Sequence, residues 1–294
     1  MQTPWGNLEV SDAHVHFFSK RFLEGLGAQC GKNGSEVAEV AGWEFPGTTE
    51  ELAHRWAGEF DQHGVGRSVL IASIPGDEVS VAAAVAACPG RFYAFAMINP
   101  LAQNAAIAAG LHAICLFPAM HGYSLHDARV DALLQQASER GMAVFVHCGV
   151  LTVGIRRKLG LPSPFDMRFS NPIDLHAIAL RYPRIRFIVP HFGAGYFREA
   201  LMLADLCPNV YLDTSSTNSW MRYEGLDLPT VFRRALDVAS PKRLLFGTDS
   251  SFFPRGWNQP VFELQVHALS HLGIAAESAR SILGENLQRI LAET

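Results

Sequence analysis

The chain of 294 residues lacks the marks of several broad classes of protein. Its five cysteines are widely spaced and include no Cys-x-x-Cys pair, so we expect no disulfide framework and a cytoplasmic, reducing location. No charged segment followed by an apolar one opens the chain, and no apolar run could cross a bilayer, so neither a signal peptide nor a membrane partner is expected. With 18% charged residues, a net charge of −4 and no long basic run, the sequence gives no sign of a nucleic-acid partner.

Short apolar runs alternate with helical patterns, and 49% of the residues are hydrophobic, enough for a large core. Strands are expected at residues 8–15, 67–74, 92–98, 113–117, 142–147, 185–189, 210–212 and 244–246, and helices at 48–62, 77–88, 104–109, 127–140, 196–206 and 229–238. This alternation predicts an α/β fold, a single (β/α)8 TIM barrel domain over residues 1–294 with long βα loops and a C-terminal helical extension. An open doubly wound sheet is the alternative, but no Gly-x-Gly-x-x-Gly turn follows the first expected strand.

Three connections are too long to be plain turns: residues 17–47, 149–172 and 215–228. All three leave the carboxyl ends of expected strands, where barrel enzymes build their active sites. They carry Trp43, Arg156, Arg157 and Trp220. Such loops predict a walled or lidded pocket, with simple loop packing as the other reading of the tryptophans.

His14 and His16 lie one residue apart at the end of the first apolar run. In a strand, side chains two positions apart project from the same face, so both imidazoles could bind one metal ion. Taken alone, such a pair also arises by chance in a chain with twelve histidines.

Three further polar residues end later apolar runs: His147, His191 and Asp249. Each could be a hydrogen-bonded group at the rim of the core, but a parallel barrel brings all strand ends to one mouth. Imidazole nitrogen and carboxylate oxygen suit zinc or a similar divalent ion.

These residues and their surroundings resemble the amidohydrolase superfamily, and within it the aminocarboxymuconate-semialdehyde decarboxylase-like branch, often called amidohydrolase 2. The resemblance includes the strings Val146-His147-Cys148, Pro190-His191-Phe192-Gly193, Leu245-Phe246-Gly247-Thr248-Asp249 and Ile282-Leu283-Gly284-Glu285-Asn286. It implies that His14, His16, His147 and Asp249 bind a metal ion. It further implies that His191 stands beside the metal-bound water or the substrate as an acid, a base or an electrophile.

The resemblance also bears on the number of ions. Relatives with two metals bridge them with a carboxylated lysine or a glutamate from strand four, and residues 113–117 contain neither. We therefore expect one divalent ion, zinc (Zn2+) or else manganese (Mn2+). Asp12 either supports the histidines of its strand or is a buried hydrogen-bonded carboxylate. Asp213 ends the seventh strand, but the pattern does not fix its facing and it is left unassigned.

Arg255 and His121 follow strand ends and are candidates for binding substrate, with a surface salt bridge as the other reading of Arg255. Asp249 can hold or accept the proton of a water molecule, which makes it a catalytic candidate together with His191. This set supports hydrolysis of an amide, ester or lactone of a small molecule. Non-oxidative decarboxylation, or hydration, of an unsaturated or aromatic acid is the alternative, and a barrel that binds a ligand without catalysis is a third. The sequence leaves open whether the chain forms a homodimer.

Overall fold

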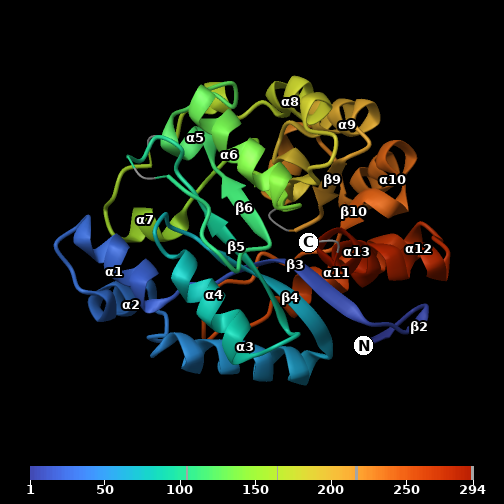
Figure 1. Cartoon of the computed structure of the whole chain (residues 1–294). Helices are drawn as coiled ribbons and strands as arrows, with labels where there is room; N and C mark the ends of the chain where they lie inside the picture. The colour runs from blue at the N-terminus through green and yellow to red at the C-terminus, as the bar shows by residue number, and fades with distance from the viewer. Residues whose placement is uncertain (104, 164, 216–217, 293–294) are drawn as a thin grey trace.

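The computed structural model describes all residues except 104, 164, 216–217 and 293–294 (Figure 1). Eight strands form one parallel sheet whose neighbours follow the order of the chain. They are β3 (Val10–His16), β4 (Val65–Ala72), β5 (Phe92–Met97), β6 (Ala113–Leu116), β7 (Ala143–Val146), β8 (Phe187–Val189), β9 (Val210–Asp213) and β10 (Leu244–Leu245). A separate antiparallel hairpin, β1 (Gln2–Thr3) and β2 (Gly6–Asn7), precedes them.

The first and last strands of the sheet are joined, which closes it into a barrel. The backbone N–H of Ala13 donates to the carbonyl of Phe246 at 2.8 Å, and that of Asp249 donates to the carbonyl of His14 at 2.9 Å. The N–H of His16 reaches the carbonyl of Ser250 at 2.7 Å. The predicted TIM barrel is therefore confirmed, and its closing seam runs through residues of the candidate site.

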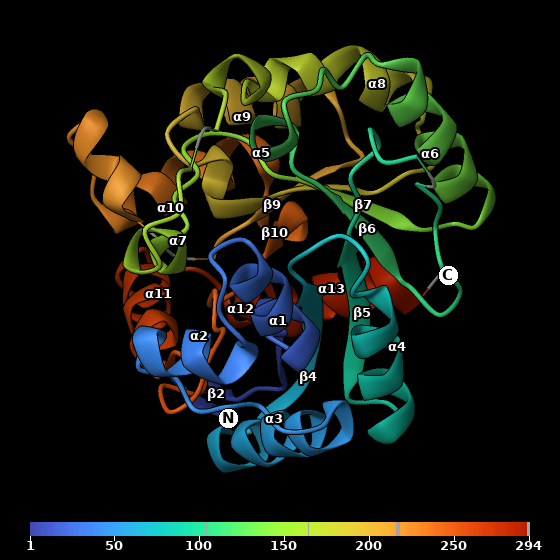
Figure 2. The same ribbon diagram turned by 90° about the vertical axis from the view of Figure 1, so that its left-hand side faces the viewer.

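Helices between the strands form the outer ring seen in Figures 1 and 2. Those of the ring are α3 (Thr49–His63), α4 (Glu78–Ala87), α6 (Ala128–Glu139), α8 (His176–Arg181), α9 (Phe197–Leu206), α10 (Leu228–Ala239) and α11 (Gln259–His271). The first of them is capped by Thr48, whose hydroxyl accepts from the N–H of Glu51 while the Glu51 carboxylate accepts from the N–H of Thr48. This reciprocal cap fixes where α3 begins.

Two long connections fold into helices over the carboxyl ends of the strands. Residues 17–47 contain α1 (Lys20–Ala28) and α2 (Gly34–Ala41), and residues 149–172 contain α7 (Gly154–Lys158), followed by the short turn η1 (Met167–Phe169). We call α1, α2 and α7 the cap, and they lie together in Figure 2. The cap has an apolar cluster of its own, formed by Phe22, Leu23, Leu26, Val37, Ala38, Ala41, Ile155 and Leu159.

The chain ends in the predicted helical extension, made of α12 (Ala276–Arg280), the π-helical turn η6 (Ser281–Glu285) and α13 (Asn286–Ala292). Leu287 and Ile290 pack into the apolar interior of the barrel, at the end opposite the cap. Shorter elements complete the chain: α5 (Pro118–His121), η2 (Pro172–Leu175), η3 (Pro190–Gly193), η4 (Asn218–Tyr223) and η5 (Pro241–Arg243). Among the described helices, none combines the length and the apolar character that a bilayer crossing requires.

The helix expected at residues 104–109 is wrong. Asn104 itself lies outside the described residues, and residues 105–109 form an irregular segment without a helix. The Asn99 side chain accepts from the N–H of Leu101 at 3.0 Å, and Arg140 donates to the carbonyl of Ile107 at 2.8 Å. The Arg140 side chain thus satisfies a backbone carbonyl of this segment and holds it in a loop conformation.

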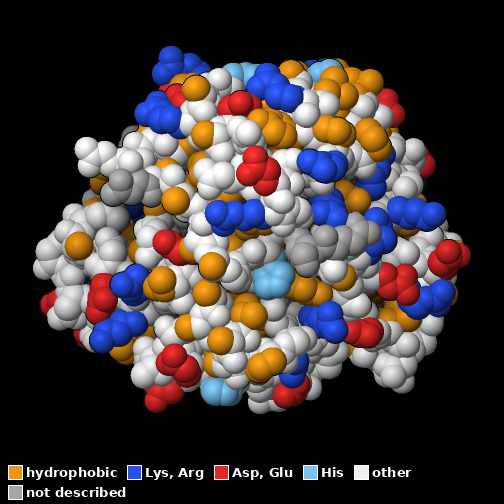
Figure 3. All heavy atoms as spheres, viewed as in Figure 1, with side chains coloured by type: hydrophobic (Ala, Val, Ile, Leu, Met, Phe, Trp, Pro, Cys, Tyr) orange, Lys and Arg blue, Asp and Glu red, His pale blue; other side chains and the backbone are white. Residues whose placement is uncertain are grey.

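The outer surface carries charges of both signs. On the face drawn in Figure 3, lysine and arginine side chains are mixed with aspartate and glutamate. The absence of a nucleic-acid partner stays a prediction.

Candidate active site

His14, His16 and Asp249 come together at the seam of the barrel. One potential ligand atom from each lies within 4.8 Å of the others. Nε2 of His16 is 3.1 Å and Nε2 of His14 is 3.7 Å from Oδ1 of Asp249. The backbone hydrogen bond from Asp249 to His14 explains why these side chains lie together, because it places the residues after β10 beside the end of β3.

The imidazole of His14 is fixed by a buried carboxylate. Its Nδ1 lies 2.6 Å from Oδ2 of Asp213 and 3.0 Å from the hydroxyl of Ser215. A carboxylate only accepts, so Nδ1 carries a hydrogen, and in the neutral ring Nε2 is the nitrogen with the lone pair that a metal ion would bind. Burial acts to lower the pKa of His14, but attraction to Asp213 and the hydrogen bond raise it above its usual value.

His16 is fixed in the same tautomer by a hydroxyl. Nδ1 of His16 lies 2.6 Å from Oγ of Ser73, and that hydroxyl donates its only hydrogen to the carbonyl of Ile71 at 3.1 Å. Ser73 must therefore accept from His16, whose Nε2 is left free to bind a cation. Burial lowers the pKa of His16, which favours the neutral form that metals bind.

Asp249 supplies the negative charge of the group. Burial acts to raise its pKa, but the neighbouring imidazoles of His16, with Nε2 at 3.1 Å, and of His14 hold that pKa well below its usual value. The carboxylate is therefore ionised at neutral pH. Its backbone is in the left-handed region, with a φ of 59°, which residues other than glycine adopt uncommonly.

His147 lies at the edge of this group rather than inside it. Its ring stacks on Phe117 with centroids 5.2 Å apart, and its centroid is 5.5 Å from that of His191. Burial lowers its pKa well below the usual value, and its buried Nδ1 has no hydrogen-bond partner among the described residues. A buried ring nitrogen without a partner is costly, so His147 fits a site completed by a bound ion. Its role as a fourth ligand stays a prediction.

His191 presents a basic nitrogen beside the group. It lies in η3 with a left-handed φ of 54°. Its Nδ1 is 3.1 Å from the carbonyl oxygen and 3.0 Å from the hydroxyl of Ser215. Because a carbonyl only accepts, Nδ1 carries the hydrogen and Nε2 is the free base. Burial lowers the pKa of His191, and its ring centroid is 5.0 Å from that of His14.

Asp12 does not support the histidine rings. Its carboxylate accepts from the N–H groups of His14 at 2.9 Å and Thr248 at 3.1 Å, and from the indole of Trp257 at 2.8 Å. Burial raises its pKa to about 6. Of the two sequence interpretations, the buried hydrogen-bonded carboxylate is the one observed, and it ties β3 to the segment after β10.

The supporting carboxylate that sequence reasoning missed is Asp213. Alternation along β9 gave a signal, since Tyr211, two residues earlier on the same face, belongs to the apolar cluster inside the barrel. Ser73 and Ser215 were missed as well, because nothing local distinguishes them from other serines after a strand.

An active-site cavity of about 640 Å³ opens above these residues. All five strand-end residues, His14, His16, His147, His191 and Asp249, line it, as do both candidate substrate-binding residues, Arg255 and His121. Arg255 donates to the carbonyl of Asp249 at 3.1 Å and to the hydroxyl of Ser251 at 2.8 Å. His121 is half-buried, burial lowers its pKa, and its Nδ1 has no partner among the described residues.

The loop residues divide between this cavity and the protein interior. Trp43 and Arg156 line the cavity, as expected of a walled pocket. Trp220 is buried against Phe197, with ring centroids 5.5 Å apart, and Arg157 is exposed. Simple loop packing therefore describes Trp220, whereas Trp43 is part of the cavity wall.

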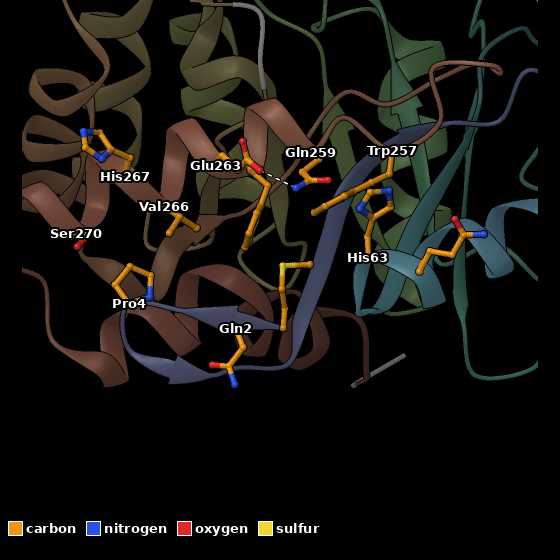
Figure 4. Close-up of a pocket in the computed structure, with 12 residues that line it drawn as sticks. Gln2, Pro4, His63, Trp257, Gln259, Glu263, Val266, His267 and Ser270 are labelled. Carbon is orange, nitrogen blue, oxygen red and sulfur yellow. Dashed lines mark hydrogen bonds between the residues drawn. The ribbon is translucent and has the colours of Figure 1, made fainter.

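A second hollow of about 770 Å³ lies outside the barrel, between the β1–β2 hairpin and α11. Figure 4 shows its lining, including His63, Trp257 and His267, with Gln259 donating to Glu263 at 2.6 Å. None of the strand-end histidines reaches it. The candidate active site is therefore the cavity under the cap.

Solved structures of the same fold match nearly all of the chain. The 5-carboxyvanillate decarboxylase of Sphingomonas paucimobilis has a TM-score of 0.65 at 15% identity, with 97% of this chain and 99% of that one covered. A Pseudomonas putida protein classed as a 2-pyrone-4,6-dicarboxylic acid hydrolase has a TM-score of 0.60 at 16% identity, covering 97% and 98%. A zinc-bound amidohydrolase of Burkholderia multivorans has a TM-score of 0.60 at 15% identity, covering 97% and 99%. At these identities, the likeness shows the fold alone.

Sequence comparison identifies the family. Protein fluG of Emericella nidulans is 35% identical to this chain over 85 residues, which are 29% of this chain and 10% of that much longer protein. A family model described as amidohydrolase matches residues 11–292. Because this match extends over nearly the whole length, the chain belongs to the amidohydrolase family.

Proposed function

We propose that this member of the amidohydrolase family is a metal-dependent hydrolase that cleaves an amide, ester or lactone bond of a small molecule. The observation that carries the proposal is the group of His14, His16 and Asp249, whose potential ligand atoms lie within 4.8 Å of one another. The group lies on the floor of a cavity of about 640 Å³, a size common among small-molecule sites.

We propose one divalent ion per chain, zinc or else manganese. His14, His16 and Asp249 would hold it, with His147 as the fourth ligand that the family resemblance implies. Their nitrogen and oxygen donors suit zinc, and β6 offers neither lysine nor glutamate to bridge a second ion. A bound divalent ion supplies Lewis acidity, which polarises a carbonyl group and lowers the pKa of water.

The protons are moved by groups of the chain. The ionised carboxylate of Asp249 can accept a proton from the attacking water, because it lies beside the two histidines at the floor of the cavity. Nε2 of His191 can pass a proton to the leaving group or steady developing negative charge. Ser215 keeps His191 in the required tautomer by accepting the Nδ1 hydrogen.

The second candidate function is non-oxidative decarboxylation, or hydration, of an unsaturated or aromatic acid. The observation that favours it is Arg255, whose guanidinium lies over the ring of Phe252 at 4.5 Å and donates to the backbone of Asp249. A guanidinium in that place could bind the carboxylate that is lost. The likeness in fold to a 5-carboxyvanillate decarboxylase is compatible with this reading.

One experiment separates the two functions. Zinc-loaded protein is incubated with panels of lactones, amides, esters and aromatic carboxylates in sealed, weakly buffered reactions, and both the acid released and the carbon dioxide formed are measured. A hydrolase releases acid without carbon dioxide, whereas a decarboxylase forms carbon dioxide from the aromatic acids. The Asp249→Asn variant, purified in the same way, is the control for contaminating activity. Carbon dioxide as the product would replace the hydrolase proposal by its alternative.

A further inference from the structure

The lining of the active-site cavity has more positive than negative side chains. Three cationic side chains line it, Arg156, Lys158 and Arg255, and Asp249 is the only carboxylate among the described residues of its lining. Within the described part of the chain, the ion pairs found include none of these three cations. A partly enclosed cavity with unbalanced positive charge attracts anions.

Two of the cations belong to the cap rather than to the barrel strands. Arg156 and Lys158 lie on α7, whereas His14 and Asp249 lie at the ends of barrel strands. Arg255 is different, because it is bound to the backbone of Asp249 at the floor. The positive charge of the cavity is therefore divided between the cap and the floor.

Neutral acceptors hold the two cap cations in place and leave donors free. Arg156 donates from Nε to the carbonyl of Pro162 at 2.9 Å and from Nη1 to the amide oxygen of Gln29 at 2.8 Å. Lys158 donates to the carbonyl of Ala41 at 2.7 Å. A guanidinium has five N–H groups and an ammonium has three, so most of these donors remain for a ligand.

An aromatic wall connects the floor with the cap. The ring of His16 stacks on Phe18 with centroids 5.5 Å apart, and Phe18 stacks on Trp43 at 5.2 Å. Trp43 in turn stacks on Phe252 at 4.8 Å, with an interplanar angle of 16°. All four rings line the cavity, so a flat apolar body would find a continuous surface along it.

We propose that Arg156 and Lys158 form an anion subsite in the cap, which binds a carboxylate at the end of the substrate remote from the reacting bond. The substrate class is an elongated carboxylate with an apolar, aromatic body that lies along the wall of Phe18, Trp43 and Phe252. The identity of the reacting end rests on the function proposed above, whereas the anion subsite itself does not.

The test is direct binding, measured by calorimetry with zinc-loaded protein. The probes are the phenylalkanoates from phenylacetate to 6-phenylhexanoate, each compared with its neutral amide. At least one acid is expected to bind tighter than its amide by about tenfold or more, the usual gain from a charge-assisted hydrogen bond. That difference is expected to shrink by a similar factor in Arg156→Gln and in Lys158→Gln.

The chain supplies a matched control in Arg157, which is on the same helix but outside the cavity lining. Arg157→Gln makes the same change of charge and is expected to leave binding unchanged. Arg156→Lys keeps the charge and is expected to retain most of the preference for the acid, which separates charge from cap packing. Thermal unfolding of each variant verifies that the cap is intact.

Two results would overturn the subsite. One is equal binding of acid and amide at every chain length, and the other is an effect of Arg157→Gln as large as that of Arg156→Gln. Because no turnover is measured, these results stand apart from the proposed reaction. A protein that binds the acids through Arg156 but hydrolyses nothing would keep the subsite and end the hydrolase proposal.

Discussion

The carboxylate of Asp213 accepts a hydrogen bond of 2.6 Å from Nδ1 of His14, and both side chains are fully buried. Asp213 ends β9 and pairs with Leu245 of β10, so the carboxylate stands directly behind the seam that carries the candidate ligands. A carboxylate in this position fixes the tautomer and the ring orientation of a metal-binding histidine and makes its other nitrogen more basic.

Asp213→Asn is therefore expected to weaken zinc binding by about 10–100-fold, the usual cost of removing such a partner. The measurement is competition for zinc with a chromophoric chelator, which needs no substrate. Asp205→Asn makes the same chemical change on the exposed face of α9 and should leave the affinity unchanged. Wild-type affinity in Asp213→Asn would show that the hydrogen bond is only structural.

The pattern of strands predicted where the site lies but not the hydrogen-bond partners of Asp12 and Asp213. Strand ends meet at the mouth of any parallel barrel, so the convergence of His14, His16 and Asp249 was predictable from their places in the chain. Strand alternation, in which residues two positions apart share a face, placed Asp12 on the same face as His14 and His16. The pairing of β3 with β4 shifts register between Asp12 and Val15, and Asp12 bonds across the seam instead.

Other features depended on contacts that no local pattern contains. The choice of Asp213 as the partner of His14 joins residues 199 positions apart. The helices of the cap were hidden because they are stabilised by a cluster that joins two connections, with Phe22 and Val37 in residues 17–47 and Ile155 in residues 149–172. Such a cluster stabilises helices that are too short to be stable in isolation.

His14→Ala and His16→Ala are each expected to lose bound zinc and turnover, with only moderate loss of stability. Each removes one nitrogen from the group within 4.8 Å while leaving the apolar core intact. Elemental analysis of the purified variants, beside thermal unfolding, measures both effects. His267→Ala, an exposed histidine of α11, is the control. Full zinc occupancy and full activity in both site variants would mean that His14 and His16 have only a structural role.

His191→Ala is expected to lower turnover by about 10²–10⁴-fold, the usual contribution of a general acid or base, while most of the metal remains. His191 lines the cavity, but it is not one of the three residues whose ligand atoms cluster. Turnover and metal content are measured on the same preparation, with His147→Ala in parallel. If His191→Ala lost zinc in step with activity and His147→Ala did not, the roles assigned to the two histidines would be exchanged.

Asp77 gives a prediction about pH and stability away from the site. It is fully buried and accepts from the hydroxyls of Ser19 and Ser80, and burial raises the pKa of its carboxyl. An acid whose pKa is higher in the folded state is easier to bury when protonated. Its unfavourable effect is therefore absent below the unfolded-state pKa of about 4 and grows as the pH rises to the folded value.

The quantity to follow is the difference in free energy of unfolding, wild type minus Asp77→Asn. This difference is expected to fall as the pH rises from about 4 to the folded-state pKa of Asp77, and then to stay level. Urea unfolding of both proteins at several pH values measures the difference, in which the other titrating groups cancel. A difference that rose with pH would mean that the serine hydroxyls outweigh burial.

Gly247 packs against the Asp213–His14 pair, which leaves no room for a side chain at this position. A Cβ at this position would lie 2.9 Å from Oδ1 of Asp213, 2.9 Å from Cβ of His14 and 3.0 Å from Cβ of Ser215. These atoms belong to buried side chains that are already hydrogen-bonded, so Gly247→Ala is expected to push the pair apart. The result should be weaker zinc binding, measured with the same chelator, together with a lower melting temperature.

Gly58 is the matched control, since a Cβ there meets no atom within 4 Å in the helix α3. Gly58→Ala is expected to stabilise the protein by roughly 0.5–1 kcal/mol, because alanine loses less backbone freedom in a helix than glycine does. The two substitutions add the same methyl group, so opposite effects on stability would trace the loss in Gly247→Ala to its neighbours. Unchanged zinc affinity in Gly247→Ala would mean that the Asp213–His14 hydrogen bond survives a displaced backbone and that its geometry is not what holds the ion.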